Sequence, residues 1–270
     1  MADEGTQPAD GIRRASALLL TRLTLVAIST VIAWWGLSMK QTGVGFPPTF
    51  TFSALGLVVV NIVCLLMTRR FVHAEGGTLR AMIGFRRGRL LGDLGWGVLW
   101  VVVLYLPFTA TIVLVMWLLN GERMFVAFET VFYDPASVPD LPAAVWLVLA
   151  IVIVLTFAPL NGPAEELTYR GYAQSRLSAV SPVIGVLVPA VVFGLQHVFF
   201  APTAQGMIVY AAAFTVWGVG SGLIFDNLQQ QYGTRPDHPV KVPVALRLVT
   251  KLNASRLSGT IGGDLAHYNS

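Results

Sequence analysis

The chain of 270 residues is 55% hydrophobic and only 12% charged, whereas an ordinary soluble domain has about 25% charged residues. This composition argues against a soluble enzyme and predicts one membrane-embedded unit, and the net charge of +4 requires no nucleic-acid partner. The single cysteine, Cys64, excludes an intramolecular disulfide and a zinc site built from cysteines.

Six apolar segments are long enough to cross the hydrocarbon core as helices, which takes about 20 residues. They are 17–38, 52–68, 94–119, 143–161, 181–200 and 207–225. The first ends near Trp34-Trp35, a pair typical of an interfacial anchor, and no convincing cleavage site precedes Lys40. We therefore expect a membrane span there rather than a cleaved signal peptide. The fold class predicted is all-α, a polytopic helical membrane protein with about six transmembrane helices.

The basic residues lie almost entirely on one side of these segments. Fifteen arginines and lysines fall before the first span, after the second, after the fourth or after the sixth, whereas only Lys40 and Arg123 fall in the other connections. Arg22 lies inside the first span. Because basic residues concentrate in cytoplasmic loops, the sequence predicts that both termini are cytoplasmic. We expect the membrane to be the plasma (inner) membrane.

Polar segments flank the apolar part of the chain. We expect a polar N-terminal tail at residues 1–14, a membrane-embedded core at 15–225 and a polar C-terminal tail at 226–270. The composition changes abruptly at residue 226, and segment 239–252 carries too many charges to cross a membrane.

Two adjacent carboxylates and an arginine lie between the fourth and fifth spans, in the sequence Glu-Glu-Leu-Thr-Tyr-Arg at 165–170. Charges at a membrane edge are costly unless they pair or have a function. Pro163 favours the start of a short helix at the cytoplasmic face, capped by Asn161 or Gly162. Glu165 would then lie in the first turn, at the positive end of the helix dipole.

Helix geometry separates the two carboxylates. Glu166 and Arg170 are four residues apart with the glutamate first, which is the spacing of a helical ion pair. Glu165 is rotated by about 100° from Glu166. We therefore expect Arg170 to hold Glu166 and Glu165 to be free to bind water or a proton. A purely structural alternative remains, because acidic residues in a first helical turn are common on soluble helices.

His197 lies inside the fifth apolar segment, in Phe193-Gly194-Leu195-Gln196-His197. Phe193 and His197 are one turn apart and share a face of the helix. A histidine in a membrane helix is often bonded only to a neighbouring helix, but it can also orient water, bind a metal or stabilise an oxyanion. Because the carboxylate segment joins spans four and five, we expect His197 to lie near Glu165.

The motif Glu165-Glu166-x-x-x-Arg170 followed by Phe193-x-x-x-His197 resembles the first two motifs of the CPBP family, which includes CAAX prenyl proteases and bacteriocin-processing enzymes. The membrane setting and the small residues of both motifs are also similar, and the resemblance covers about residues 80–225. The small residues are Gly162, Gly171 and Gly194. The resemblance implies an intramembrane endopeptidase that acts on a membrane-associated substrate, such as a prenylated CAAX-type protein, or on a peptide.

The resemblance also implies roles for the residues. Glu165 would activate the attacking water, Arg170 would hold Glu166, and His197 would position the water or stabilise the oxyanion. Two carboxylates and one histidine make only a minimal metal site, since catalytic zinc usually has three protein ligands. We therefore expect no metal cofactor, with zinc as the metal if one is used.

The family's third motif, His-x-x-x-Asn on a further membrane helix, is not found after the sixth span. The glycine-rich segment 218–225 resembles the helix before that motif, but the chain then turns polar. Asp226 and Asn227 could substitute for the missing groups, the C-terminus could be truncated or altered, or the protein could be a non-catalytic relative such as an immunity factor or scaffold. A transporter with a proton relay is a further alternative, although no inverted repeat supports it.

Overall fold

The structure is a computed structural model and describes residues 8–83 and 90–232. Its elements in chain order are α1 (Pro8–Ser38), α2 (Phe50–Ala74), α3 (Leu79–Ile83), α4 (Leu90–Asn120), η2 (Gly121–Arg123), α5 (Met124–Phe132), η3 (Pro135–Ser137), α6 (Ala143–Glu165), η4 (Glu166–Gln174), α7 (Ser175–Leu177), α8 (Pro182–Gln196), η5 (His197–Phe200) and α9 (Ala204–Tyr232). Every regular element in these ranges is helical, which confirms the predicted all-α class.

The chain divides into two compact units, residues 1–225 and 226–270. The second unit is described only over residues 226–232, which are the last turns of α9. The remainder of the predicted polar tail lies outside the described residues. At the other end α1 begins at Pro8, so residues 8–14 of the predicted N-terminal tail are helical.

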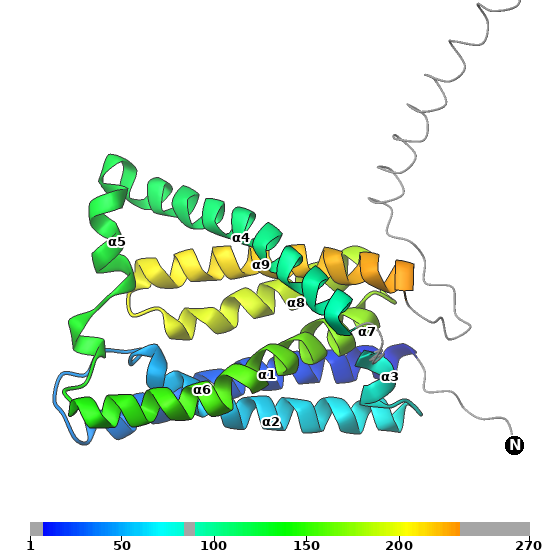
Figure 1. Cartoon of the computed structure of the whole chain (residues 1–270), viewed down its shortest axis with the longest axis horizontal. Coiled ribbons are helices and arrows are strands. Elements are labelled where there is room, and N and C mark those ends of the chain that lie inside the picture. The colour runs from blue at the N-terminus through cyan, green and yellow to red at the C-terminus, as the bar shows by residue number, and fades with distance from the viewer. Residues whose placement is uncertain (1–7, 84–89, 233–270) are drawn as a thin grey trace, which may run out of the picture. The chain divides into compact units, whose positions relative to one another are not determined.

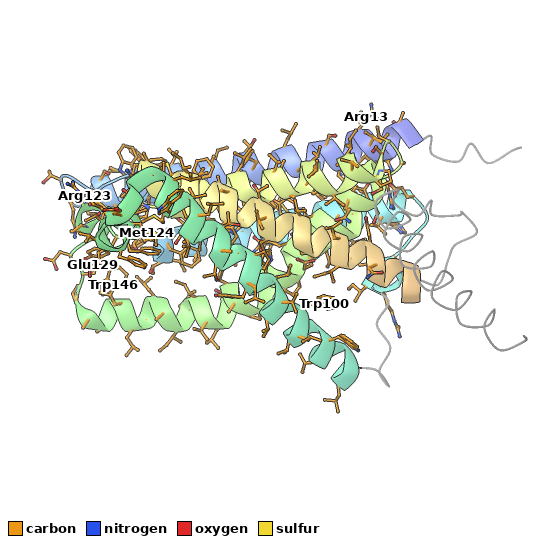
Figure 2. The ribbon with its side chains drawn as sticks, turned by 90° about the horizontal axis from the view of Figure 1, so that it is seen from above. Arg13, Trp100, Arg123, Met124, Glu129 and Trp146 are labelled. Carbon is orange, nitrogen blue, oxygen red and sulfur yellow. The ribbon has the colours of Figure 1, made fainter. Side chains whose placement is uncertain are left out.

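Six segments of the described chain are long and apolar enough to cross a membrane, as predicted. They are Ala9–Ser38, Phe50–Ala74, Leu94–Ser137, Ala143–Leu177, Pro182–Phe200 and Ala204–Asn227. The protein is therefore an integral membrane protein. Most side chains of α4 are exposed, as for Leu106 and Leu118, and Figure 2 shows them projecting from the helix around Trp100. Such apolar surface suits contact with lipid, which is as apolar as leucine.

Helix α2 packs against both α1 and α6 in the first unit, and α8 and η4 pack against α1 (Figure 1). Their contact buries one apolar core, with Leu18 and Val26 from α1, Leu57 and Cys64 from α2, and Tyr169 from η4. Residues far apart in the sequence therefore meet along α1, so a polar side chain on its inner face can reach both α2 and the segment after α6.

Helices α8 and α9 approach closely at glycines. A Cβ atom on Gly194 would lie 2.1 Å from Thr215 Oγ1 and 2.5 Å from the carbonyl oxygen of Ala211. Small residues let membrane helices pack with their backbones in close contact. The close approach brings Phe214 of α9 onto the ring of His197, with the two ring centroids 3.5 Å apart and the planes inclined by 8°.

Two of the three connections predicted to lie opposite the basic side meet each other in the structure. Gln41, after α1, donates to the carbonyl oxygen of Asp140, before α6, over 2.7 Å and accepts from the Asp140 amide over 3.1 Å. Gly45 and Thr49 donate to Ala136 and Ser137 of the same connection. These bonds hold both connections at one end of the helices.

A second polar cluster joins the elements that carry the basic residues. Glu75, just after α2, accepts hydrogen bonds from Tyr172 over 2.6 Å and from Arg176 Nη2 over 2.6 Å, and its carboxylate lies 3.5 Å from Arg14 Nη1. The start of α1, the end of α2 and the segment after α6 therefore meet, as the predicted topology requires. Arg86, Arg87 and Arg89 lie outside the described residues, and the assignment of this end to the cytoplasm stays a prediction.

The Glu75 cluster predicts a pH-dependent stability. Burial raises the pKa of Glu75, but the hydrogen bonds from Tyr172 and Arg176 and the charges of Arg176 and Arg14 outweigh burial, so this pKa lies below its usual value. A depressed folded-state pKa stabilises the protein above the unfolded-state pKa, and this contribution disappears as the pH falls through the folded-state value. We expect Glu75→Gln to lower the free energy of unfolding by about 1–2 kcal/mol at pH 7.

Unfolding of the detergent-solubilised protein at pH 7 and pH 4 measures this effect. The difference between wild type and Glu75→Gln should shrink at the lower pH, whereas Glu129→Gln, an exposed carboxylate of α5, should match wild type at both. A loss of stability that is equal at the two pH values would contradict an ionised Glu75 as its source.

Candidate active site

Helix α6 continues at Glu165 directly into η4, a π-helix. The predicted separate helix starting at Pro163, with Asn161 or Gly162 as its cap, is therefore wrong, since Pro159 and Pro163 both lie inside α6. An apolar environment penalises unpaired backbone groups, which favours a continuous helix over a capped break. Glu165 thus lies at the C-terminal end of a membrane-spanning helix and not in a first turn. π-helices are rare and often occur at functional sites.

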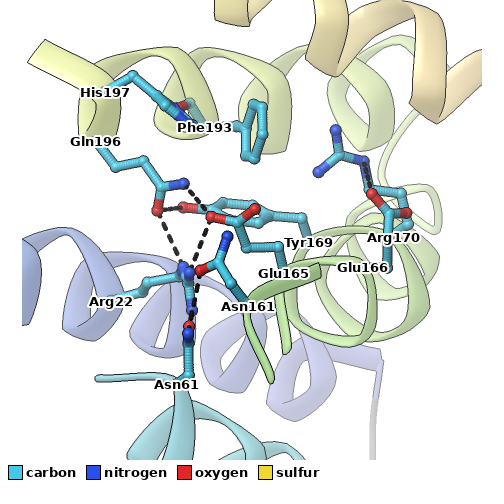
Figure 3. A network of polar contacts seen from close by, with 10 residues as sticks. All are labelled: Arg22, Asn61, Asn161, Glu165, Glu166, Tyr169, Arg170, Phe193, Gln196 and His197. Atoms are coloured by element: carbon cyan, nitrogen blue, oxygen red, sulfur yellow. Dashed lines mark hydrogen bonds and ion pairs between the residues drawn. The ribbon is translucent and has the colours of Figure 1, made fainter. Parts of the chain in front are cut away.

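Glu165 lies at the centre of a buried polar network (Figure 3). Its Oε1 accepts a hydrogen bond from Arg22 Nη2 over 3.1 Å and from Gln196 Nε2 over 2.8 Å. The Arg22 side chain is 0% exposed and that of Glu165 is 12% exposed. Glu165 therefore has a cationic partner, Arg22 of α1, that the local spacing did not reveal, and both bonds go to one of its two oxygens.

Arg22 uses its whole guanidinium group in this network. Its Nε donates to Gln196 Oε1 over 3.0 Å, and its Nη1 donates to Asn61 Oδ1 over 3.0 Å. The Tyr169 hydroxyl donates to the same Gln196 oxygen over 2.8 Å. A buried arginine is stable only when its charge and its N–H groups are satisfied, and here one carboxylate and two amide oxygens satisfy them.

Glu166 is held less closely than Glu165 and is more exposed to solvent. Its Oε1 lies 3.9 Å from Arg170 Nε, and its side chain is 56% exposed. The expected pair with Arg170 is thus present but long. Arg170 itself is 2% exposed and donates to Ser221 of α9 over 3.1 Å, with its guanidinium over the Phe193 ring at 4.7 Å.

His197 and Phe193 share one face, as the spacing predicts, and their ring centroids lie 4.6 Å apart. His197 Nδ1 lies 2.6 Å from the carbonyl oxygen of Phe193. A carbonyl oxygen only accepts, so Nδ1 must carry the proton of this bond. In a neutral imidazole Nε2 then holds the lone pair, so this nitrogen can accept a hydrogen bond from water but cannot donate to an oxyanion.

Glu165 and His197 line the same cavity, as expected from their neighbouring spans. It has a volume of about 580 Å³ and is otherwise mostly aromatic and aliphatic. Its lining comprises Phe50, Leu57, Phe108, Ile112, Phe128, Phe132, Phe157, Asn161, Glu165, His197, Phe200, Tyr210 and Phe214. A carboxylate, an imidazole and an amide therefore face a space that is large enough for a lipid chain or an extended peptide.

The other predicted groups lie elsewhere. Arg170 and Glu166 do not line this cavity. Asp226 and Asn227 lie on α9 in the second unit, and their substitution for the missing third motif stays a prediction. Across residues 8–83 and 90–232, no three histidine, cysteine or acidic side chains lie close enough together to hold a metal ion. The absence of a metal cofactor likewise stays a prediction.

The sequence did not indicate the part that four polar residues take in the network, namely Arg22, Asn61, Asn161 and Gln196. Asn161 was expected only as a helix cap, but it lines the cavity. A signal existed for Arg22, because an arginine inside an apolar span is itself a mark of function. No signal marked Asn61, since a single amide in a membrane helix is common and its partner is distant in the sequence.

Residues 144–230 match the family model described as type II CAAX prenyl endopeptidase, Rce1-like. The match includes both motifs and confirms the resemblance to CAAX prenyl proteases over that range, whereas Arg22 and Asn61 lie outside it. No curated protein and no solved structure matches the chain. At the level of the family, the match supports a CAAX-type intramembrane protease.

Proposed function

We propose, from this family match, that the protein is an intramembrane endopeptidase that hydrolyses a peptide bond in a membrane-associated substrate of the prenylated, CAAX type. The observation that supports this most is the cavity where Glu165 and His197 face a wall built largely from phenylalanines. An aromatic wall suits an isoprenoid chain, and the polar groups suit a scissile amide beside it.

In the proposed reaction Glu165 is the general base. Its Oε1 is occupied by Arg22 and Gln196, and both of its hydrogen bonds within the described chain go to that oxygen. Oε2 takes the proton of a water whose oxygen forms a bond to the carbonyl carbon, while the carbonyl electron pair moves to oxygen. The C–N bond then breaks as the carbonyl re-forms, and Glu165 returns the proton to the leaving amine.

His197 orients the attacking water in this proposal. With Nδ1 bonded to the Phe193 carbonyl, Nε2 can accept a hydrogen bond from the water and direct its lone pair at the substrate. Of the two roles expected for His197, we propose the positioning of water and not the donation of a hydrogen bond to the oxyanion. No metal is proposed, because Glu165 and His197 are too few ligands for catalytic zinc.

We also propose that the active site opens toward the cytoplasm from the plasma (inner) membrane, with both termini cytoplasmic. The distribution of basic residues supports this orientation, and the Glu75 cluster gathers Arg14 and Arg176 at one end of the helices.

A cleavage assay tests the proposal. The purified protein in lipid nanodiscs receives a fluorogenic peptide that ends in a farnesylated CAAX sequence, with the unprenylated peptide as the matched control. We expect hydrolysis of the prenylated peptide, slower hydrolysis of the control and no effect of EDTA. Failure to cleave either peptide would favour a scaffold or immunity role, and metal-reversible inhibition would refute the metal-free reaction.

A further inference from the structure

We infer that Asn161 supplies the amide donor that binds the oxyanion of the tetrahedral intermediate, and that Arg22 and Asn61 position it. The inference rests on the proposed hydrolysis and assigns a residue to a task that neither motif covers. His197 cannot perform this task as a neutral ring bonded through Nδ1 to the Phe193 carbonyl.

The directions of the hydrogen bonds determine the orientation of two side-chain amides, first that of Asn61 and then that of Asn161. Arg22 only donates, so the Asn61 atom that it contacts over 3.0 Å must be the carbonyl oxygen Oδ1. Asn61 must then present Nδ2 on its other side, where it donates to Asn161 Oδ1 over 3.0 Å. Asn161 Oδ1 is therefore occupied, and its Nδ2 group with two N–H donors is turned away from Asn61.

The place of Asn161 suits this task. It lies one helical turn before Glu165 on α6, so the two side chains share a face, and both line the cavity. Figure 3 shows the Asn161 amide nitrogen on the side of the Glu165 carboxylate, with its oxygen toward Asn61. Water activated by Glu165 would thus attack a carbonyl whose oxygen lies near an oriented amide donor.

The other polar groups of the site are less suited. Gln196 Nε2 already donates to Glu165, and Gln196 does not line the cavity. Tyr210 lines it, but within the described chain no hydrogen bond fixes the direction of its hydroxyl. Electrostatic catalysis depends on donors oriented before the reaction, which favours Asn161 over Tyr210.

Kinetics on the farnesylated peptide test the donor. Removing one oxyanion donor typically lowers kcat by about 100- to 1,000-fold with little change in KM, and we expect this of Asn161→Ala and of Asn161→Asp. Tyr210→Phe measures the competing donor and should lower kcat far less than Asn161→Ala does. The control is Thr156→Val, on the exposed face of α6. A kcat of Asn161→Ala within threefold of wild type would overturn the inference.

A double-mutant cycle tests the positioning. Asn61→Asp keeps an acceptor for Arg22 but loses the donor to Asn161, so kcat should fall. Because both changes act on one donor, Asn61→Asp should lower kcat much less when Asn161 is already alanine. A merely structural role of Asn61 would give multiplicative losses, and that result would overturn the positioning role.

A binding measurement tests the donor role of Asn161 independently of peptide hydrolysis. The probe is a farnesylated peptide with an uncleavable phosphinate in place of the scissile amide, whose anionic oxygen imitates the oxyanion. Wild type should bind it at least about 100-fold more tightly than the matching amide peptide, and Asn161→Ala should lose this preference. Equal binding of both peptides by wild type would overturn the inference. Absent cleavage with a retained preference would overturn only the proposed function.

Discussion

Glu165→Gln is expected to lower kcat for the farnesylated peptide by about 100- to 10,000-fold, the range that one general base contributes. The amide retains an oxygen where Oε1 accepts from Arg22 and Gln196, so the network and the fold should persist. What it loses is the basic oxygen that takes the proton from water. Initial rates in nanodiscs measure the effect, and thermal unfolding in the same sample verifies the fold.

Two comparisons sharpen this result. Glu122→Gln, an exposed carboxylate in η2, should leave the rate unchanged. Glu166→Gln should lower it less than Glu165→Gln does, because Glu166 is 56% exposed and does not line the cavity. Retained hydrolysis by folded Glu165→Gln would refute the assignment of the base. A larger loss of rate in Glu166→Gln than in Glu165→Gln would instead assign Glu166 as the base.

Arg22→Met should have the largest effect on stability, lowering the free energy of unfolding by about 3–5 kcal/mol, which is typical when one partner of a buried ion pair is removed. The Glu165 charge would lose its cation, and the oxygens of Asn61 and Gln196 would lose their donors. Chemical unfolding of detergent-solubilised protein measures the change.

The chain supplies a matched control on the same helix. Arg13 is 79% exposed and pairs with Asp10 at 3.1 Å, so Arg13→Met should change stability by less than about 1 kcal/mol. The double variant Arg22→Met/Glu165→Gln should be more stable than Arg22→Met alone, since it no longer buries an unpaired charge. A double variant no more stable than the single would show that packing, and not charge, explains the loss.

The sequence by itself determined the features that rest on local composition. Apolar runs of membrane length gave the helical class and the six spans, because a bilayer leaves a backbone few other ways to satisfy its hydrogen bonds. The spacing from Phe193 to His197 and the short link between spans four and five placed the histidine near Glu165, since segments joined by a short link tend to be neighbours.

Only the tertiary structure decided how the carboxylates are held. Arg22 and Glu165 are 143 residues apart, and a contact of that separation has no period or spacing by which it can be found. Their contact exists because α1 packs against η4 and α8. Local helix rules paired Arg170 with Glu166 and left Glu165 free to bind water or a proton. In the folded protein Glu165, and not Glu166, has the closer cationic partner. A buried charge is stable only beside an opposite charge, and the tertiary fold can supply it from any distance along the chain.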